Sequence, residues 1–267
     1  MEKVISDIAN RSHHIIPVRE GDFVKDGLWH CGICKSPKQY KKDMDGFMIN
    51  AMCLCKCEAE KLRKEEEEER RKREAEEKKR QRVLCFPSPE LANCTFANSD
   101  TPNKPSENYV SHSAKALEDG TGLLFYGGVG TGKTYMAAAV ANALIDEGYT
   151  VRFNTARGYA DQFFSDKNVM LETLRACHFV ILDDLYAERQ TEYMQETVFQ
   201  IVNIRYEMQL PIIVTTNLSP AHFQKPQNVS EERIFSRLTR CFPVLISGED
   251  RRKKQSRTSD WKEVLYG

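Results

Sequence analysis

The segment Leu123–Thr134, LLFYGGVGTGKT, decides the fold of this chain. An apolar run typical of a buried strand leads into Gly127–Gly132, which holds four glycines, and Lys133 and Thr134 complete the pattern. The Ala-rich residues that follow favour a helix. Glycines let backbone N–H groups approach a polyphosphate, and a helix N-terminus adds partial positive charge. Strand, glycine-rich loop and helix in this order predict a phosphate-binding loop.

The positions of this loop have distinct expected roles. Lys133 is expected to bind the β- and γ-phosphates of ATP, and the Thr134 hydroxyl to coordinate Mg²⁺. The alternative interpretation is an ordinary glycine turn before a helix. The residues expected to contact the nucleotide are Gly127, Gly128, Val129, Gly130, Thr131, Gly132, Lys133, Thr134 and Tyr135.

Strand-like and helix-like segments alternate downstream of the loop. This alternation predicts an α/β fold with a doubly wound parallel sheet. The expected strands cover residues 150–154, 179–184, 211–217 and 242–246, and the expected helices cover 109–119, 158–164, 191–208 and 232–240.

Polar side chains stand at the carboxyl ends of two of these strands. Asp183 and Asp184 end the run FVILDD, and Asn217 ends PIIVTTN. Because ligands of such sheets bind at the carboxyl ends of the strands, these side chains are expected to converge on the phosphate loop. We expect Asp183 to hold Mg²⁺, Asp184 to orient or deprotonate the attacking water, and Asn217 to sense the γ-phosphate. The alternative is a strand that simply meets solvent.

Three arginines follow on one face of the last predicted helix. Arg233, Arg237 and Arg240 stand at i, i+4 and i+7. An arginine presented to the γ-phosphate of a neighbouring subunit would stabilise transition-state charge. Spacing alone favours the alternative, a solvated basic face.

Composition excludes some classes of protein. The 39 basic and 39 acidic residues give a net charge of zero, so polyanion binding would have to come from local patches. The amino terminus lacks the apolar segment of a signal peptide, and no apolar run is long enough to cross a membrane. We therefore expect a cytoplasmic protein without membrane contact.

Five of the nine cysteines lie between Cys31 and Cys57. A Cys-x-x-Cys turn, Cys31 and Cys34, brings two thiolates to one ion, and a second group further along completes a tetrahedral Zn²⁺ site. From that group the pair Cys55 and Cys57 is favoured, with Cys53 as the alternative. The competing interpretation is a small disordered region with reduced thiols.

A charged segment separates this cysteine-rich part from the phosphate loop. Residues 58–82 are nearly all Glu, Lys and Arg, with opposite charges at i, i+4, which predicts a solvated helical linker rather than a basic nucleic-acid arm. Before the cysteines, Val4, Ile5, Ile8 and Ala9 have helical spacing. The expected organisation is an N-terminal zinc-binding module over 1–57, a linker over 58–82 and an ATPase domain over 83–267.

The motifs GGVGTGKT, FVILDD, PIIVTTN, ERIFSRLTR and GEDRRKK, in this order, resemble those of the AAA+ ATPases of the DnaC/IstB group. The cysteine-rich segment is similar to that of DnaC-type replicative helicase loaders. The resemblance covers about residues 90–255, and residues 29–57 more loosely. It identifies Lys133 and Thr134 with Walker A, Asp183 and Asp184 with Walker B, Asn217 with sensor 1, Arg237 with the arginine finger, and Arg252, or alternatively Arg251, with sensor 2.

This resemblance implies an ATP-dependent loader. Its N-terminal module would bind a DnaB-type replicative helicase, and its AAA+ domain would self-associate and engage single-stranded DNA. Asp184 stands where most AAA+ proteins have Glu, and no DNA-binding loop is assigned between Asn154 and Phe179. The alternatives are an IstB-like helper that activates a transposase, and a nucleotide-switched adaptor that hydrolyses little ATP.

Overall fold

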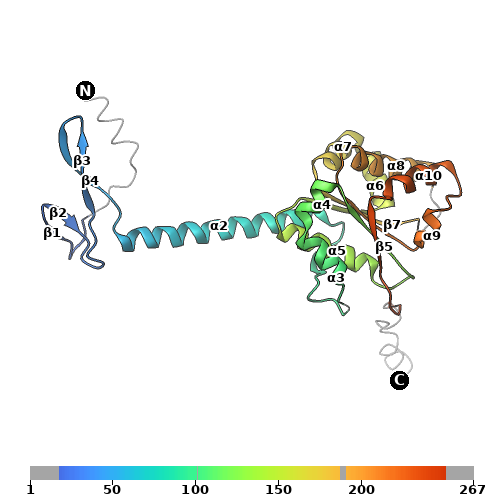
Figure 1. The fold of residues 1–267 in the computed structure, drawn as a ribbon, viewed down its shortest axis with the longest axis horizontal. Helices are drawn as coiled ribbons and strands as arrows, with labels where there is room; N and C mark the ends of the chain where they lie inside the picture. Colours follow the sequence, from blue (N-terminus) through green and yellow to red (C-terminus); the bar gives the residue numbers. More distant parts are fainter. Residues whose placement is uncertain (1–17, 101, 187–190, 251–267) are drawn as a thin grey trace, which may run out of the picture. The chain divides into compact units, whose positions relative to one another are not determined.

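The computed structural model describes residues 18–100, 102–186 and 191–250 (Figure 1). The chain divides into two compact units, Met1–Ala75 and Glu76–Gly267. The predicted N-terminal helix around Val4 and the two sensor 2 candidates, Arg251 and Arg252, lie outside the described residues. None of the helices within the described ranges has the length and apolarity that a membrane span requires.

The N-terminal unit contains two antiparallel hairpins that the sequence analysis did not predict. Each turns at an Asp-Gly pair with positive φ, Asp26–Gly27 and Asp45–Gly46, the typical composition of a two-residue β-hairpin loop. The two Asp-Gly pairs are therefore the sequence signal from which these hairpins could have been predicted. The strands are β1 (Phe23–Lys25), β2 (Leu28–His30), β3 (Gln39–Met44) and β4 (Phe47–Met52).

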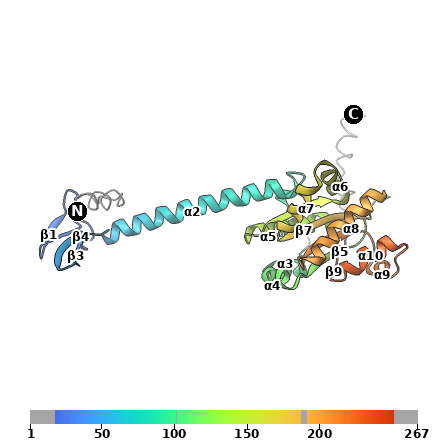
Figure 2. The same cartoon turned by 90° about the horizontal axis from the view of Figure 1, so that it is seen from above.

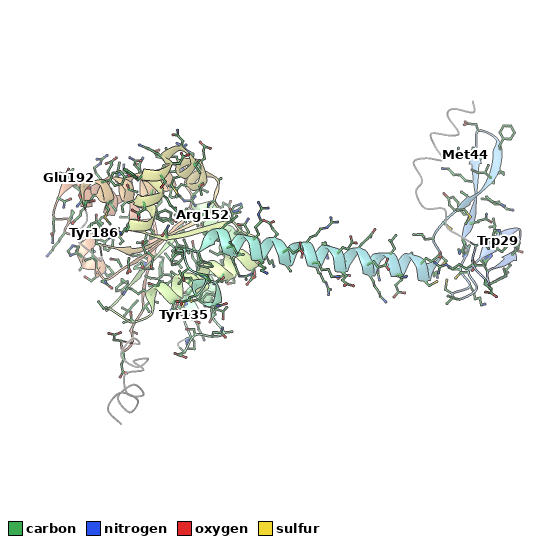
Figure 3. The ribbon with its side chains drawn as sticks, turned by 180° about the vertical axis from the view of Figure 1, so that it is seen from behind. Trp29, Met44, Tyr135, Arg152, Tyr186 and Glu192 are labelled. Atoms are coloured by element: carbon green, nitrogen blue, oxygen red, sulfur yellow. The ribbon has the colours of Figure 1, made fainter. Side chains whose placement is uncertain are left out.

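The charged segment forms one helix, α2 (Lys56–Cys85), which extends beyond the predicted 58–82 at both ends. Opposite charges at i, i+4 meet on its surface, as between Glu67 and Arg71 at 2.6 Å. The boundary between the two units falls within this helix. Its last turns belong to the second unit, where Arg82 pairs with Asp146 at 2.6 Å and Arg152 donates to the carbonyl of Leu84 (Figure 3).

The second unit is built on a five-stranded parallel sheet with the order β6-β7-β8-β5-β9. The strand that precedes the phosphate loop, β5, lies between β8 and β9, the last two strands in the chain. The predicted parallel α/β sheet is confirmed. The strands are β5 (Gly122–Tyr126), β6 (Val151–Thr155), β7 (Phe179–Leu185), β8 (Ile212–Thr216) and β9 (Cys241–Leu245).

Helices cover both faces of this sheet (Figures 1 and 2). Successive strand residues alternate between two apolar clusters, so that Phe125 packs on one face and Leu124 on the other. The first cluster includes η1 (Leu91–Asn93), α3 (Lys104–Ser111) and α5 (Lys133–Asp146). The second includes α6 (Ala156–Ser165), α7 (Lys167–Ala176), α8 (Glu192–Glu207) and α10 (Val229–Leu238), and the short helices α4 (Ser113–Asp119) and α9 (Pro220–Phe223) complete the unit.

Two helical segments differ from the prediction. The single helix expected over 109–119 is divided at His112, the residue between α3 and α4. The segment between β6 and β7 holds a pair of helices, of which only the first was predicted. Asp166 ends α6 and caps α7, accepting a hydrogen bond from Val169 N at 3.0 Å, so a capping residue was the missed signal.

Candidate functional site

The phosphate loop joins β5 to α5 in the predicted strand, loop and helix order. Gly127 has φ 152°, and a Cβ at this position would lie 2.2 Å from the carbonyl oxygen of Ile246, so only glycine fits. No side chain caps the N-terminus of α5, whereas Thr155 and Asp166 cap α6 and α7. The first N–H groups of α5 therefore remain available to an anion.

Lys133 lies within the loop that it would use to bind phosphate. Its Nζ donates to the carbonyl oxygens of Gly127 at 3.2 Å and Gly128 at 2.7 Å, and the residue is buried. Val129, at the tip of the loop, is 62% exposed. The lysine ammonium is thus held beside the backbone that would surround a polyphosphate.

A hydroxyl–carboxylate network lies at the carboxyl ends of β7 and β8. Asp183 Oδ1 accepts hydrogen bonds from Thr134 Oγ1 at 3.1 Å and from Thr215 Oγ1 at 2.6 Å. The structure thus joins the two residues predicted to hold Mg²⁺, Thr134 of α5 and Asp183 of β7. A carboxylate and a hydroxyl are suitable ligands for that ion.

The environment of Asp183 disfavours its charged form. Burial, and to a lesser extent the neighbouring Asp184 carboxylate, raises the pKa of Asp183 to about 6, although the hydroxyls of Thr215 and Thr134 oppose this rise. Carboxylates whose pKa is perturbed in this way cluster at functional sites.

Asp184 has an unusual backbone. It is exposed and has φ 56°, in the left-handed region, at the point where the register between β7 and β8 shifts. Its N–H donates to Thr215 Oγ1 at 2.9 Å. The register shift between Leu182 and Leu185 is thus a β-bulge that contains both aspartates at the carboxyl end of β7.

Asn217 lies immediately after β8 and is exposed. It makes no hydrogen bond with any residue inside the described ranges, so its sensing role stays a prediction. Thr215, two residues earlier, makes the contact with Asp183 that the sequence analysis did not assign. The signal was present, because two threonines end an otherwise apolar strand.

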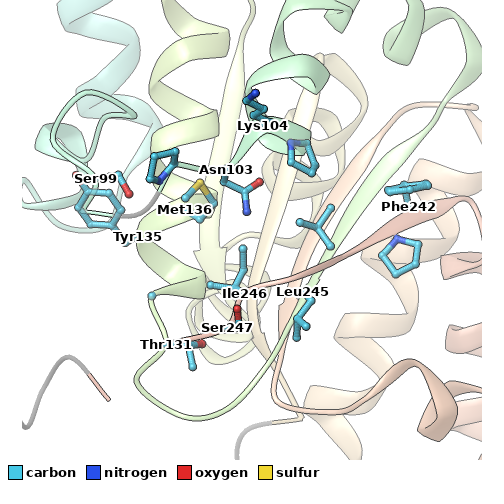
Figure 4. A pocket seen from close by; sticks show the side chains of 15 residues that line it. Ser99, Asn103, Lys104, Thr131, Tyr135, Met136, Phe242, Leu245, Ile246 and Ser247 are labelled. Carbon is cyan, nitrogen blue, oxygen red and sulfur yellow. The ribbon is translucent and has the colours of Figure 1, made fainter. Parts of the chain in front are cut away.

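A cavity of about 560 Å³ opens beside the first turn of α5 (Figure 4). Thr131, Gly132 and Tyr135 line it from the loop and helix, and residues 242–247 line it from β9 and the segment that follows. Residues 102–105 form a third wall. Tyr135, which was predicted to contact nucleotide, is fixed by a hydrogen bond from its hydroxyl to Thr95 O at 3.0 Å. The cavity is large enough for a nucleoside next to the phosphate loop.

Arg237 does not contact the residues of the phosphate loop. It lies on α10 and is directed to α8, where its Nε donates to Asn203 Oδ1 at 2.7 Å. Arg233 and Arg240 also face α8, over the rings of Phe199 and Tyr206. All three arginines therefore face α8, although α10 ends at Leu238 and Arg240 lies beyond the helix that was predicted to carry it.

A second site lies in the N-terminal unit. The Sγ atoms of Cys31, Cys34, Cys55 and Cys57 all lie within 4.8 Å of one another. Cys57 Sγ is 3.6 Å from that of Cys31 and 3.3 Å from that of Cys55. Four thiolates around a tetrahedral Zn²⁺ are roughly 3.8 Å apart for Zn–S bonds of about 2.3 Å, so the cluster fits zinc. These are the four favoured cysteines, and the alternative, Cys53, lies outside the cluster.

Hydrogen bonds prepare the first pair of cysteines for a cation. Backbone N–H groups of Cys34 and Ile33 lower the pKa of the Cys31 thiol. The Ser36 hydroxyl, 3.0 Å from Cys34 Sγ, is the main reason why the pKa of Cys34 falls to about 5. Both effects favour the thiolate, which is the form that binds metal.

A buried ion pair supports this cluster. Lys38 is fully buried, and its Nζ lies 2.8 Å from Asp22 Oδ2 and 3.6 Å from Glu58 Oε1. Asp22 Oδ1 also accepts from Gly32 N at 2.9 Å, within the Cys31–Cys34 turn. A Cβ on Gly32 would lie 2.2 Å from Gly21 O, so this turn requires glycine. No local sequence pattern connects these residues, which is why they were not predicted.

A family model described as IstB-like ATP binding protein matches residues 52–259, which is most of the chain. The chain belongs to this family. Membership in a family of ATP-binding proteins agrees with the geometry of the site. The phosphate loop and the N-terminus of α5 offer N–H groups to phosphates, and the cavity lies next to them.

Two curated relatives are similar over part of their length. The replicative helicase loader DnaI of Bacillus subtilis is 31% identical over 50% of this chain and 48% of its own. The uncharacterized protein YdaV of Escherichia coli is 29% identical over 55% of this chain and 62% of its own. The match thus spans about half to three-fifths of these relatives. A solved structure of DnaI aligns with a TM-score of 0.49 and 24% identity over 65% of this chain and all of that chain.

Proposed function

We propose that this protein is an ATP-hydrolysing loader of a replicative DNA helicase. The observation that supports it most directly is the Thr134–Asp183–Thr215 network beside an uncapped helix N-terminus and a nucleoside-sized cavity. The name of the DnaI relative supports the helicase as partner. Engagement of single-stranded DNA and self-association through the AAA+ domain are part of the same proposal.

The residues of the site would divide the work of hydrolysis. Lys133 exchanges its bonds to the loop carbonyls for bonds to the β- and γ-phosphates, and the N–H groups of Gly127–Gly132 surround them. Asp184 orients the attacking water and receives its proton, and Asn217 contacts the γ-phosphate. Thr215 holds both Asp183 Oδ1 and the Asp184 N–H, which keeps the two carboxylates in register.

Two metal ions belong to this proposal. Mg²⁺, held by Thr134 and Asp183, would neutralise charge on the phosphates during hydrolysis. Zn²⁺, held by Cys31, Cys34, Cys55 and Cys57, would provide structure and no chemistry, because all four positions around it are filled by protein.

The β3–β4 hairpin supplies a surface for the helicase. The register places Tyr40, Met44, Phe47 and Ile49 on one face. These side chains are exposed, Phe47 by 76% and Met44 by 47% (Figure 3). A solvent-facing apolar strip on a small module is typical of an interaction site. We infer that this face contacts the helicase.

The family match favours one alternative, a transposition helper. An IstB-like match over 52–259 fits a protein that activates a transposase as well as one that delivers a helicase. A nucleotide-switched adaptor is the third possibility, and it differs from both in needing ATP binding without hydrolysis.

A pull-down tests these possibilities. Zinc-loaded protein is incubated with the replicative helicase of its host or with a co-encoded transposase, each with ATP, ADP or a non-hydrolysable ATP analogue. The loader predicts nucleotide-dependent capture of the helicase, lost in Phe47→Asp. Met48→Asp is the control, because Met48 is 64% exposed but lies on the other face of the same strand.

Other outcomes decide against the proposal. Capture of the transposase alone would assign the protein to transposition. Partner release that is equal with ATP and with the analogue would remove hydrolysis from the mechanism. Lys133→Ala should abolish the dependence on nucleotide, and ATP binding that survives this substitution would contradict the assignment of the phosphate loop.

A further inference from the structure

The side chain of Asn203 lies between two partners of opposite character. Arg237 Nε donates to its Oδ1 at 2.7 Å, and its own Nδ2 donates to Glu207 Oε1 at 2.8 Å. Because Arg offers only donors and a carboxylate only acceptors, these partners permit one orientation of the amide. Glu207 thus fixes Asn203, and Asn203 fixes Arg237.

The remaining contacts of Arg237 restrict its guanidinium further. Nη1 donates to the carbonyl oxygen of Arg233 at 2.7 Å, one turn earlier on α10. The guanidinium carbon lies 5.0 Å from the centre of the Phe199 ring and 5.7 Å from that of Tyr206. The Nη2 group has no hydrogen bond to any residue that the structure describes, and the side chain is half-buried. One end of the guanidinium is therefore held, while the other is left to a partner.

Holding an arginine in one rotamer before it meets its target has a kinetic effect. A free arginine side chain loses about 2 kcal/mol of rotamer entropy when it is ordered. If Asn203 has already ordered the side chain, that loss does not add to the activation barrier. Among the residues that the structure describes, Asn203 is the one whose side chain accepts a hydrogen bond from Arg237 Nε.

We propose that Asn203, oriented by Glu207, is a positioning residue that holds the Arg237 guanidinium for the ATP of a neighbouring subunit. This inference rests on the proposed ATP hydrolysis in an assembly, and on the role of arginine finger that the family resemblance implies for Arg237. The inference assigns a role to two residues of α8, Asn203 and Glu207, and neither of them lines the cavity beside the phosphate loop.

Steady-state ATP hydrolysis over a protein dilution series tests this inference. Asn203→Ala should lower the assembly-dependent kcat about 10-fold, with KM for ATP unchanged within about twofold, because binding is retained while the arginine is no longer positioned. Arg237→Ala should lower it on the order of 1,000-fold. The double variant should equal Arg237→Ala, because Asn203 acts only through Arg237.

Two further variants separate positioning from folding. Glu207→Ala, an exposed change, should lower kcat about threefold by freeing the amide to rotate, and Glu207→Gln, which keeps an acceptor oxygen, should restore it. The matched control is Gln200→Ala. Gln200 makes the same kind of bond within α8, from its Nε2 to Glu196 Oε1 at 3.1 Å, and this bond does not involve a residue of α10.

The outcomes are distinct. A loss in Asn203→Ala that persists at the same factor in the Arg237→Ala background would overturn the positioning role, as would an unchanged kcat in both Asn203→Ala and Glu207→Ala. If Arg237→Ala leaves turnover unchanged and independent of assembly, Arg237 is not an arginine finger, and the positioning role of Asn203 is overturned with it, whereas the proposed ATP hydrolysis by Lys133 and Asp183 is not.

Discussion

The two units of this chain are stabilised by different interactions. In the ATPase unit, all five residues of β8 are buried, and the sheet alternates between two large apolar clusters. In the N-terminal unit, β3 and β4 are exposed over nearly their whole length, and within residues 18–55 the buried residues are Cys31, Ser36, Lys38 and Cys55. So short a segment cannot enclose an apolar core, and a thiolate cluster with a buried ion pair replaces it.

The largest expected effect follows from removing the metal. Cys31→Ser should release zinc and unfold the N-terminal unit while the ATPase unit stays folded, because structural zinc contributes roughly 10–16 kcal/mol to such modules. Elemental analysis and hydrogen exchange over residues 18–55, compared with the parallel sheet, measure this.

Cys53→Ser is the matched control for that experiment. Its Sγ faces the carbonyl of Pro37 at 3.7 Å and lies outside the cluster, so zinc should be retained. Unchanged metal content in Cys31→Ser would show that the cysteine cluster does not hold zinc, and that metal does not replace an apolar core in the N-terminal unit.

The ATPase unit has its own buried cation, Arg205. This side chain is fully buried and donates to four carbonyl oxygens, those of Leu174, Cys177, His178 and Pro211, at 2.6–2.9 Å. Arg205→Ala leaves these carbonyls without a donor and should lower the free energy of unfolding of this unit by about 3–5 kcal/mol. Chemical denaturation followed through the ATPase unit measures the change.

Arg175→Ala provides the comparison. Arg175 pairs with Glu172 at 3.3 Å on the surface of α7, so its removal should change stability by less than about 0.5 kcal/mol. Equal effects for the two arginines would mean that burial does not set the contribution of Arg205.

The pH dependence of the nucleotide-free ATPase unit should report on Asp183. Its pKa of about 6 exceeds 3.8, the ordinary value of an aspartate carboxyl group, so the folded state binds the proton more tightly than the unfolded chain does. Stability should therefore fall as pH rises from about 4 to 6, by up to about 3 kcal/mol, and stay low above that range. Denaturation of the wild type and of Asp183→Asn at each pH gives the difference that belongs to this carboxyl; equal pH profiles would contradict it.

The smallest change in stability is expected for a substitution on the surface of α2. Glu67 and Arg71 are 2.6 Å apart but largely exposed, so Arg71→Ala should change the stability of either unit by less than about 0.5 kcal/mol. A change above about 1 kcal/mol in thermal unfolding would indicate that the surface ion pairs of this helix stabilise a unit.

The sequence predicted the features that depend on local pattern. The phosphate loop, the five parallel strands and the favoured cysteines follow from glycine spacing, apolar runs and the Cys-x-x-Cys turn, and the structure has all three. It did not predict the contacts of Asp22 with Lys38 or of Thr215 with Asp183. These residues lie 16 and 32 positions apart, so only the folded backbone brings them together.

The hairpins of the N-terminal unit were only partly predictable from the sequence. Their Asp-Gly turns are local signals, but the strands lack the alternation of apolar and polar residues that identifies a half-buried strand. A unit that is held by zinc, as we propose for this one, has less need of such alternation, and pattern-based prediction loses its main signal there.

The left-handed φ of 56° at Asp184 has a consequence for the variation this position can accept. Asp and Asn adopt this conformation far more readily than most other residues, because their short polar side chains can bond locally. The usual AAA+ glutamate would be strained on this backbone. Lys35, Tyr186 and Gln209 hold a similar φ elsewhere in the structure, so Glu at this position is a matter of cost. Exchange of Asp184 for Glu should lower stability by about 1 kcal/mol unless the bulge at the end of β7 changes as well.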